Sequence, residues 1–116
     1  MPVLTVHTTA TIDDGAIPTL LTACSTTLAE AMAQPEGYVM TLFERADAMT
    51  MAGTSDPSCL VDVRSVVELT GDQTQAITAR LCSLVRDHLG VEPNRVFVNF
   101  TDFRRAMWGF NGSTLA

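Results

Sequence analysis

Residues 3–9 have the sequence VLTVHTT, and residues 59–67 have the sequence CLVDVRSVV. In both stretches apolar and polar side chains alternate, which is typical of a strand with one buried face. The match extends outward, because segment 2–8 resembles segment 58–64 and segment 28–43 resembles segment 84–100. The two halves of the chain therefore look like two copies of one unit, too few for a solenoid.

A helix is predicted after each of these two strands. Pro18 suits the first turn of the first helix, and Pro35 with Gly37 ends it. The second helix opens at residues 71–73, and Gly90 closes it as a C-cap residue. Apolar side chains recur at helical spacing in both segments, at Leu20, Cys24, Leu28, Ala31 and Met32 and at Ile77, Leu81, Leu84 and Leu89.

Two further strands are predicted, YVMTLF at 38–43 and RVFVNF at 95–100. A loop at 46–57 separates the halves, and residues 104–116 form a tail rich in apolar and turn residues. We predict one α+β domain over residues 1–116, in which two β-α-β units form a four-stranded mixed sheet with both helices on one face. Because the segments 38–43 and 95–100 are apolar on both faces, we expect a partner chain to cover the other face.

Composition limits the function classes. The chain has 116 residues, of which 47% are hydrophobic; its 13 acidic residues outnumber seven arginines, and it has no lysine. A net charge of −6 argues against a nucleic-acid binder and against a polybasic membrane anchor. No apolar run is long enough to span a bilayer, and no signal peptide precedes the domain. Three scattered cysteines, Cys24, Cys59 and Cys82, predict a reduced cytoplasmic protein without zinc or iron–sulfur chemistry.

Pro2 is the candidate catalytic residue. Removal of Met1 before a small second residue would leave Pro2 with a secondary amine. An α-amino group titrates near ~7.7–8.0, and burial lowers that pKa by disfavouring the charged form. A buried Pro2 amine would then be neutral at pH 7 and available as a general base.

Several segments carry a resemblance to a known family. They are MPVLTVHT at 1–8, Met49 with GTSDP at 53–57, the strand end Arg64-Ser65-Val66, NRVFVNF at 94–100, and NGSTLA at 111–116. In order and spacing the chain resembles the macrophage migration inhibitory factor family of the tautomerase superfamily. The absence of lysine and the Ala, Thr and Arg bias predict a bacterial source.

The resemblance implies a homotrimer that tautomerises phenylpyruvate-like aromatic 2-oxo acids, and dopachrome-like model compounds, without a cofactor or a metal. Pro2 would be the base, in sites between subunits that also use Val66 and, from a neighbouring chain, Phe97 and Asn99. Val66 would supply a backbone N–H and Asn99 a hydrogen bond. Some animal members are secreted without a signal peptide.

Departures from the family pattern predict weak activity. Gln34 stands where the family usually has a lysine that pairs with the substrate carboxylate, and a charge-assisted bond is roughly twice as strong as a neutral one. Phe97 replaces a tyrosine, while Trp108 and Phe110 keep the mouth of the site aromatic. Ser58 and Val61 occupy the positions of the family's CxxC pair, so dithiol chemistry is not expected.

Alternatives stay open at this point. Arg104 or Arg105 could supply the missing cation, or form a solvated pair on the surface; Arg64 is expected on an exposed strand position. His7 is expected to be a structural histidine. The chain could also be a non-catalytic cytokine-like interaction protein or a ligand-binding regulatory module, since fold alone does not separate these from an enzyme.

Overall fold

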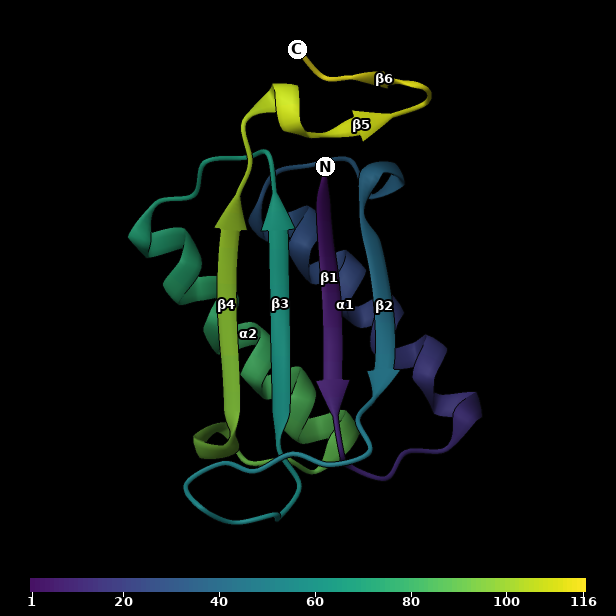
Figure 1. Ribbon diagram of the computed structural model, residues 1–116, viewed down its shortest axis with the longest axis vertical. Helices are drawn as coiled ribbons and strands as arrows, with labels where there is room; N and C mark the ends of the chain where they lie inside the picture. Colours follow the sequence, from purple (N-terminus) through teal and green to yellow (C-terminus); the bar gives the residue numbers. More distant parts are fainter.

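A four-stranded sheet with two helices on one side forms the body of the structure, a computed structural model that describes residues 1–116 (Figure 1). The strands are β1 (Pro2–Thr8), β2 (Met40–Arg45), β3 (Cys59–Ser65) and β4 (Val96–Asp102), in the order β2-β1-β3-β4. β1 is parallel to β2 and β3 to β4, whereas the central strands β1 and β3 are antiparallel. The two β-α-β units therefore run in opposite directions, and the predicted α+β class with a mixed sheet is confirmed.

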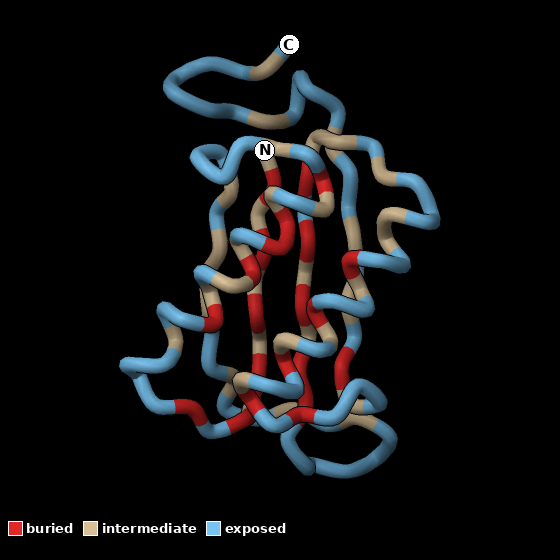
Figure 2. The backbone as a smooth tube through the Cα atoms, turned by 180° about the vertical axis from the view of Figure 1, so that it is seen from behind, coloured by how far each residue is buried: buried red, intermediate tan, exposed pale blue.

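Helices α1 (Ile17–Ala31) and α2 (Gly71–Leu89) cover the same face of the sheet, and the buried positions of the central strands lie beneath them (Figure 2). Alternate residues of β1 and β3 face the helices, as the period of two requires. The core is a cluster of 17 buried apolar residues that includes Leu4, Val6, Val61, Val63, Leu20, Leu28, Ile77, Leu81 and Val85. Burial of each large aliphatic side chain stabilises the fold by about 1.5–3 kcal/mol.

The ends of α2 follow the sequence signals. Thr70 and Gln73 form a capping box, in which the Gln73 N–H donates to Thr70 Oγ1 (3.2 Å) and the Thr70 N–H donates to Gln73 Oε1 (2.9 Å). At the other end Gly90 has φ 69°, a left-handed conformation that glycine adopts without steric cost. The predicted bounds of this helix are confirmed, as is Pro18 in the first turn of α1.

The second strand differs from the prediction at its start. Residues Glu36–Tyr38 form a 3₁₀ turn, η2, and β2 begins only at Met40. The Tyr38 N–H donates to the Pro35 carbonyl (3.1 Å), and the Val39 N–H donates to the Glu36 carbonyl (3.0 Å). The turn that Pro35 opens therefore prevails over the β-forming preference of Tyr38 and Val39.

The other strand bounds shift by one or two residues. β1 begins at Pro2 and ends at Thr8, whose hydroxyl accepts from the Ala10 N–H (3.0 Å) and turns the chain. β3 ends at Ser65 rather than at Val67, because Ser65 Oγ accepts from the Val67 N–H (2.8 Å). β4 extends to Asp102.

Arg95 fastens the loop at 46–57 to the end of the sheet. Its guanidinium donates to the carbonyls of Pro57 (3.0 Å), Asp56 (2.8 Å) and Met51 (3.2 Å). These bonds close one end of the sheet with a loop that contains no strand or helix.

The tail contains structure that the sequence did not predict. After the 3₁₀ turn η4 (Arg105–Met107), strands β5 (Gly109–Phe110) and β6 (Ser113–Thr114) form a small antiparallel hairpin. Figure 1 shows this hairpin above the start of β1, so both chain termini lie at the same end of the sheet.

The face opposite the helices is open. Val3, Thr5 and His7 of β1 point to it, and the register places Met40 beside Val3. Met40 is 60% exposed, and Phe97, on the outer strand β4, is 64% exposed. The expectation that further copies of the chain cover this face stays a prediction.

Candidate active site

A pocket of about 210 Å³ lies between the start of β1 and the C-terminal hairpin. Its walls come from three places: the first residues of the chain, the turn η2 with the start of β2, and the hairpin. The lining residues are Met1, Val3, Gly37, Tyr38, Val39, Met40, Trp108, Gly109 and Phe110. The fold thus brings together the chain start and the predicted aromatic residues Trp108 and Phe110.

Pro2 lies between two residues that line this pocket, Met1 and Val3. It is fully buried, at the first position of β1, and pairs with Ser65 of β3. With Met1 attached, the Pro2 nitrogen is an amide, and the amine belongs to Met1. Burial lowers the pKa of the Met1 amine from its ordinary value of 8.0, and the positive charge of Arg105 lowers it further. The surroundings therefore favour a neutral amine.

Gln34 lies beside the Met1 amine because of how α1 ends. Ala33 adopts φ 51°, and its N–H donates to the Glu30 carbonyl (3.3 Å), while the Gln34 N–H donates to the Ala29 carbonyl (3.0 Å). This pair of bonds is a Schellman motif with alanine in the left-handed position. It turns Gln34 toward the chain start, where its Oε1 lies 3.5 Å from the Met1 amine nitrogen.

Aromatic side chains form the outer wall. Tyr38 and Phe110 meet edge to face with ring centroids 5.7 Å apart, and Phe103 and Trp108 meet similarly at 5.6 Å. Edge-to-face pairs are worth about 0.5–1.5 kcal/mol beyond area burial. The Tyr38–Phe110 pair joins η2 to the hairpin, and the Phe103–Trp108 pair packs Trp108 against the end of β4. Tyr38, Trp108 and Phe110 give the pocket an apolar side suited to an aromatic ring.

Val66 provides a free donor beside Pro2. It follows Ser65, the register partner of Pro2, and its backbone N–H makes no hydrogen bond within the chain. Val66 lines a neighbouring hollow of about 320 Å³ together with Glu68, Asp102, Phe103, Arg104 and Arg105. The expected donor group is therefore available, but in the neighbouring hollow rather than in the pocket itself.

Phe97 and Asn99 lie elsewhere in the chain. The β4 residue level with Pro2 is Asp102, five positions beyond Phe97. At about 3.3 Å per strand residue, Phe97 is on the order of 16 Å from that level and Asn99 on the order of 10 Å. Both are exposed, and the Asn99 side chain makes no hydrogen bond within the chain. One chain alone does not bring them to Pro2.

Sequence reasoning missed two features of the pocket. Tyr38, the only tyrosine of the chain, was assigned to a strand. Its place directly after Pro35 and Gly37 was the available signal for a turn. Met40 contributes to the pocket wall because it starts β2 beside Val3.

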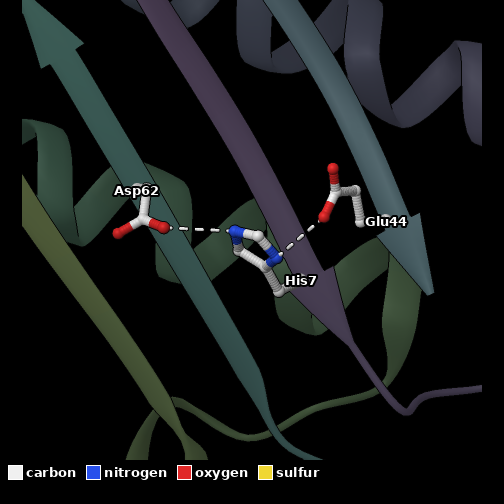
Figure 3. A network of polar contacts seen from close by, with 3 residues as sticks. All are labelled: His7, Glu44 and Asp62. Atoms are coloured by element: carbon white, nitrogen blue, oxygen red, sulfur yellow. Dashed lines mark hydrogen bonds and ion pairs between the residues drawn. The ribbon is translucent and has the colours of Figure 1, made fainter. Parts of the chain in front are cut away.

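His7 lies away from this pocket, toward the other end of the open face (Figure 3). Its Nε2 is 3.1 Å from Asp62 Oδ2, and its Nδ1 is 3.5 Å from Glu44 Oε2. The ring thereby links β2, β1 and β3, as expected of a structural histidine.

The cysteines and acidic residues form neither a disulfide nor a cluster of metal ligands. All three cysteines are free, and burial raises the pKa of Cys24 and of Cys59 to about 12. No group of three or more His, Cys, Asp or Glu side chains is arranged to hold a metal ion. None of the helices has the length and apolar character needed to cross a membrane.

Comparison with known proteins identifies relatives over the full chain. The family described as Macrophage migration inhibitory factor (MIF) matches residues 1–116. Macrophage migration inhibitory factor of Rattus norvegicus is 34% identical over 119 residues, which cover 100% of both chains. The solved structure of a homologue from Prochlorococcus marinus has a TM-score of 0.92 at 32% identity, covering 98% of this chain and 99% of that chain.

A further solved structure, of a protein inactivated by 2-oxo-3-pentynoate, has a TM-score of 0.88 at 20% identity and covers 97% of this chain and 95% of that chain. That likeness concerns the fold alone.

Two opposed β-α-β units with a proline at the start of the first strand define a protein of the tautomerase superfamily. Within that superfamily the chain belongs to the macrophage migration inhibitory factor family. The relatives include a rat protein and a Prochlorococcus protein, so the predicted bacterial source stays a prediction.

Proposed function

We propose that the chain is a keto–enol tautomerase of phenylpyruvate-like aromatic 2-oxo acids, with the Pro2 amine as general base once Met1 is removed. The observation that carries this proposal is the chain start: Pro2 follows Met1 at the pocket, and burial and Arg105 lower the pKa of the Met1 amine there. Family membership supports the same reaction class.

The reaction needs one proton to move. In the keto-to-enol direction the neutral Pro2 nitrogen takes a proton from the carbon next to the carbonyl, and the carbonyl oxygen becomes an enolate that is then protonated. The free Val66 N–H is a suitable donor to that oxygen. The aromatic wall formed by Tyr38, Trp108 and Phe110 suits the substrate ring.

A homotrimer completes the proposed site. Phe97 and Asn99 are exposed on β4 and too far along the strand to serve Pro2 of their own chain. In a trimer they would belong to the site of the neighbouring chain. Sedimentation velocity measures the assembly, and a monomer with full activity would contradict this part of the proposal.

The experiment combines intact mass with a phenylpyruvate tautomerase assay. Removal of Met1 is expected in the mass, and Pro2→Gly should lower kcat/KM on the order of 100-fold or more, because general-base catalysis contributes about 10²–10⁴-fold. Pro93→Gly, at the start of the turn before β4, is the matched control and should retain activity.

The pH dependence follows from the sign of the pKa shift. The neutral amine is the active form, so activity falls as the pH drops below the pKa of the amine. A lowered pKa therefore extends activity toward acid pH. Covalent labelling by 2-oxo-3-pentynoate, which an amine attacks at its alkyne, provides a second readout. Labelling that is equal in Pro2→Gly and wild type would exclude Pro2 as the reactive group.

The alternative is a non-catalytic cytokine-like interaction protein on the same scaffold. Gln34 and Phe97, which replace a lysine and a tyrosine of the family pattern, favour it. A processed wild-type chain that is no faster than buffer on any 2-oxo acid tested would support this alternative.

A further inference from the structure

The proposed substrate carries a carboxylate, and this chain lacks the usual cation for it. Gln34 offers only neutral donors, and its Nε2 already lies 3.4–3.5 Å from the carbonyls of Ala33 and Met32. The chain as a whole carries a net charge of −6, so an anion is not attracted by the overall field. A local positive charge at the pocket is therefore needed.

Arg105 is held next to the pocket wall by the end of the chain. Its Nε–H donates to the Leu115 carbonyl (3.0 Å), and the Leu115 N–H donates to the Trp108 carbonyl (3.1 Å). Trp108 itself lines the pocket. The two bonds fix the guanidinium relative to the aromatic wall.

The outer nitrogens of Arg105 are unused. Its Nη1 and Nη2 make no hydrogen bond or ion pair within the chain, although Glu68 and Asp102 line the same hollow. A guanidinium has five N–H donors, so four remain after the bond to Leu115. These are the donors that bind a carboxylate in a bidentate fashion.

The charge of Arg105 also acts inside the pocket. It is the one side chain whose charge lowers the pKa of the Met1 amine, after the larger effect of burial. Arg104 and Arg64 have no such effect. Arg104 lies at the start of η4, and Arg64 is exposed on the open face across from Val3.

From these contacts we infer that Arg105 is the residue that binds the substrate carboxylate, in the role left vacant by Gln34. The nature of the substrate rests on the proposed function, but the binding of a carboxylate at Arg105 does not require turnover. The Leu115 carbonyl positions the guanidinium.

Trp108 makes a test without turnover possible. It is the only tryptophan and lies in the pocket wall, so its fluorescence reports on occupancy. The processed full chain is titrated with phenylacetate and, as the uncharged analogue, with phenylacetamide. The variants are Arg105→Gln, the charge-retaining Arg105→Lys, and the matched controls Arg104→Gln and Arg64→Gln. Phenylpyruvate and its methyl ester are compared as substrates in parallel.

For Arg105→Gln we expect the Kd of phenylacetate and the KM of phenylpyruvate to rise on the order of tenfold or more, because hydrogen bonds to charged groups are stronger than neutral ones. The Kd of phenylacetamide, the kinetics of the ester, and both control variants should stay near wild type. The Kd and KM of Arg105→Lys should lie between those of the wild type and of Arg105→Gln, since lysine keeps the charge but loses the planar guanidinium. Adding Gln34→Lys to Arg105→Gln should restore acid binding.

The outcomes separate the two proposals. Phenylacetate binding that is unchanged in Arg105→Gln, or absent from the wild type, overturns the inference about Arg105. An acid and an amide that lose affinity equally would also overturn it, because that result indicates a damaged pocket. A wild type that binds phenylacetate through Arg105 yet turns over no 2-oxo acid overturns the proposed function and leaves the carboxylate site standing.

Discussion

Replacing Ala33 by glycine should stabilise the protein. Ala33 has φ 51°, and a left-handed conformation costs a residue with a Cβ about 1–2 kcal/mol. Glycine removes that cost but adds about 0.5–1 kcal/mol of conformational entropy to the unfolded chain. Ala33 is exposed, so no packing is lost. The net gain in the free energy of unfolding is then about 0.5–1 kcal/mol, or about 2–4 °C in Tm for a domain of this size.

Urea unfolding followed by far-UV circular dichroism measures this change. The midpoint should rise while the slope stays constant, because the surface exposed on unfolding is the same. Ala31→Gly is the control: Ala31 is the last residue of α1, in right-handed helix, and glycine there should cost about 1 kcal/mol. If both glycine variants lose stability alike, then Ala33 does not end the helix in a Schellman motif, and our explanation of why Gln34 lies beside the Met1 amine fails with it.

Three further predictions concern the core, the loop and the thiols. Leu81→Ala should lower the free energy of unfolding in urea by about 3 kcal/mol, because Leu81 is 1% exposed and its loss leaves a cavity; a loss below 1 kcal/mol would contradict its place in the core. Arg95→Gln should speed amide exchange across residues 51–57 with little change in global stability, since its guanidinium binds four carbonyls there; unchanged exchange would show that the loop is ordered without Arg95. Cys24 and Cys59 should resist iodoacetamide at pH 8 until urea is added, because their pKa values of about 12 keep the thiols protonated. The same shifts imply that stability falls as the pH rises above the ordinary thiol value of 9.0, and rapid labelling of the folded chain at pH 8 would contradict them.

The sequence predicted the fold well where the hydrophobic pattern was regular. The buried face of β1 and β3 follows from the alternation in VLTVHTT and CLVDVRSVV. The buried face of α2 follows from the helical spacing of its apolar residues, which ends at Gly90. The predicted start of the second strand was wrong because Tyr38 and Val39 favour strands while Pro35 favours a turn. The two hydrogen bonds of the 3₁₀ turn η2, which form only in the folded chain, decide in favour of the turn.

The site was predicted less completely, for a physical reason. Order along the chain and the family resemblance were enough to predict Pro2, Gln34 and the two aromatic residues Trp108 and Phe110 as site residues. The choice between Arg104 and Arg105 depends on a bond to Leu115, ten residues away in a tail without hydrophobic periodicity. Such a contact forms only when the hairpin folds over the chain start, and no local pattern encodes it.

The two β-α-β units run in opposite directions, so only one end of the sheet carries the α-amino group of the chain. Ser58 is the counterpart of Pro2 in the second half, at the opposite end of the sheet, and its buried hydroxyl has no hydrogen-bond partner. A polypeptide has a single α-amino group, so the second β-α-β unit has the same arrangement of strands and helix without the base of the proposed reaction. A circular permutant opened between Pro57 and Ser58 would move that group to the other end of the sheet, where Arg95 holds the loop, and away from the pocket at the C-terminal hairpin.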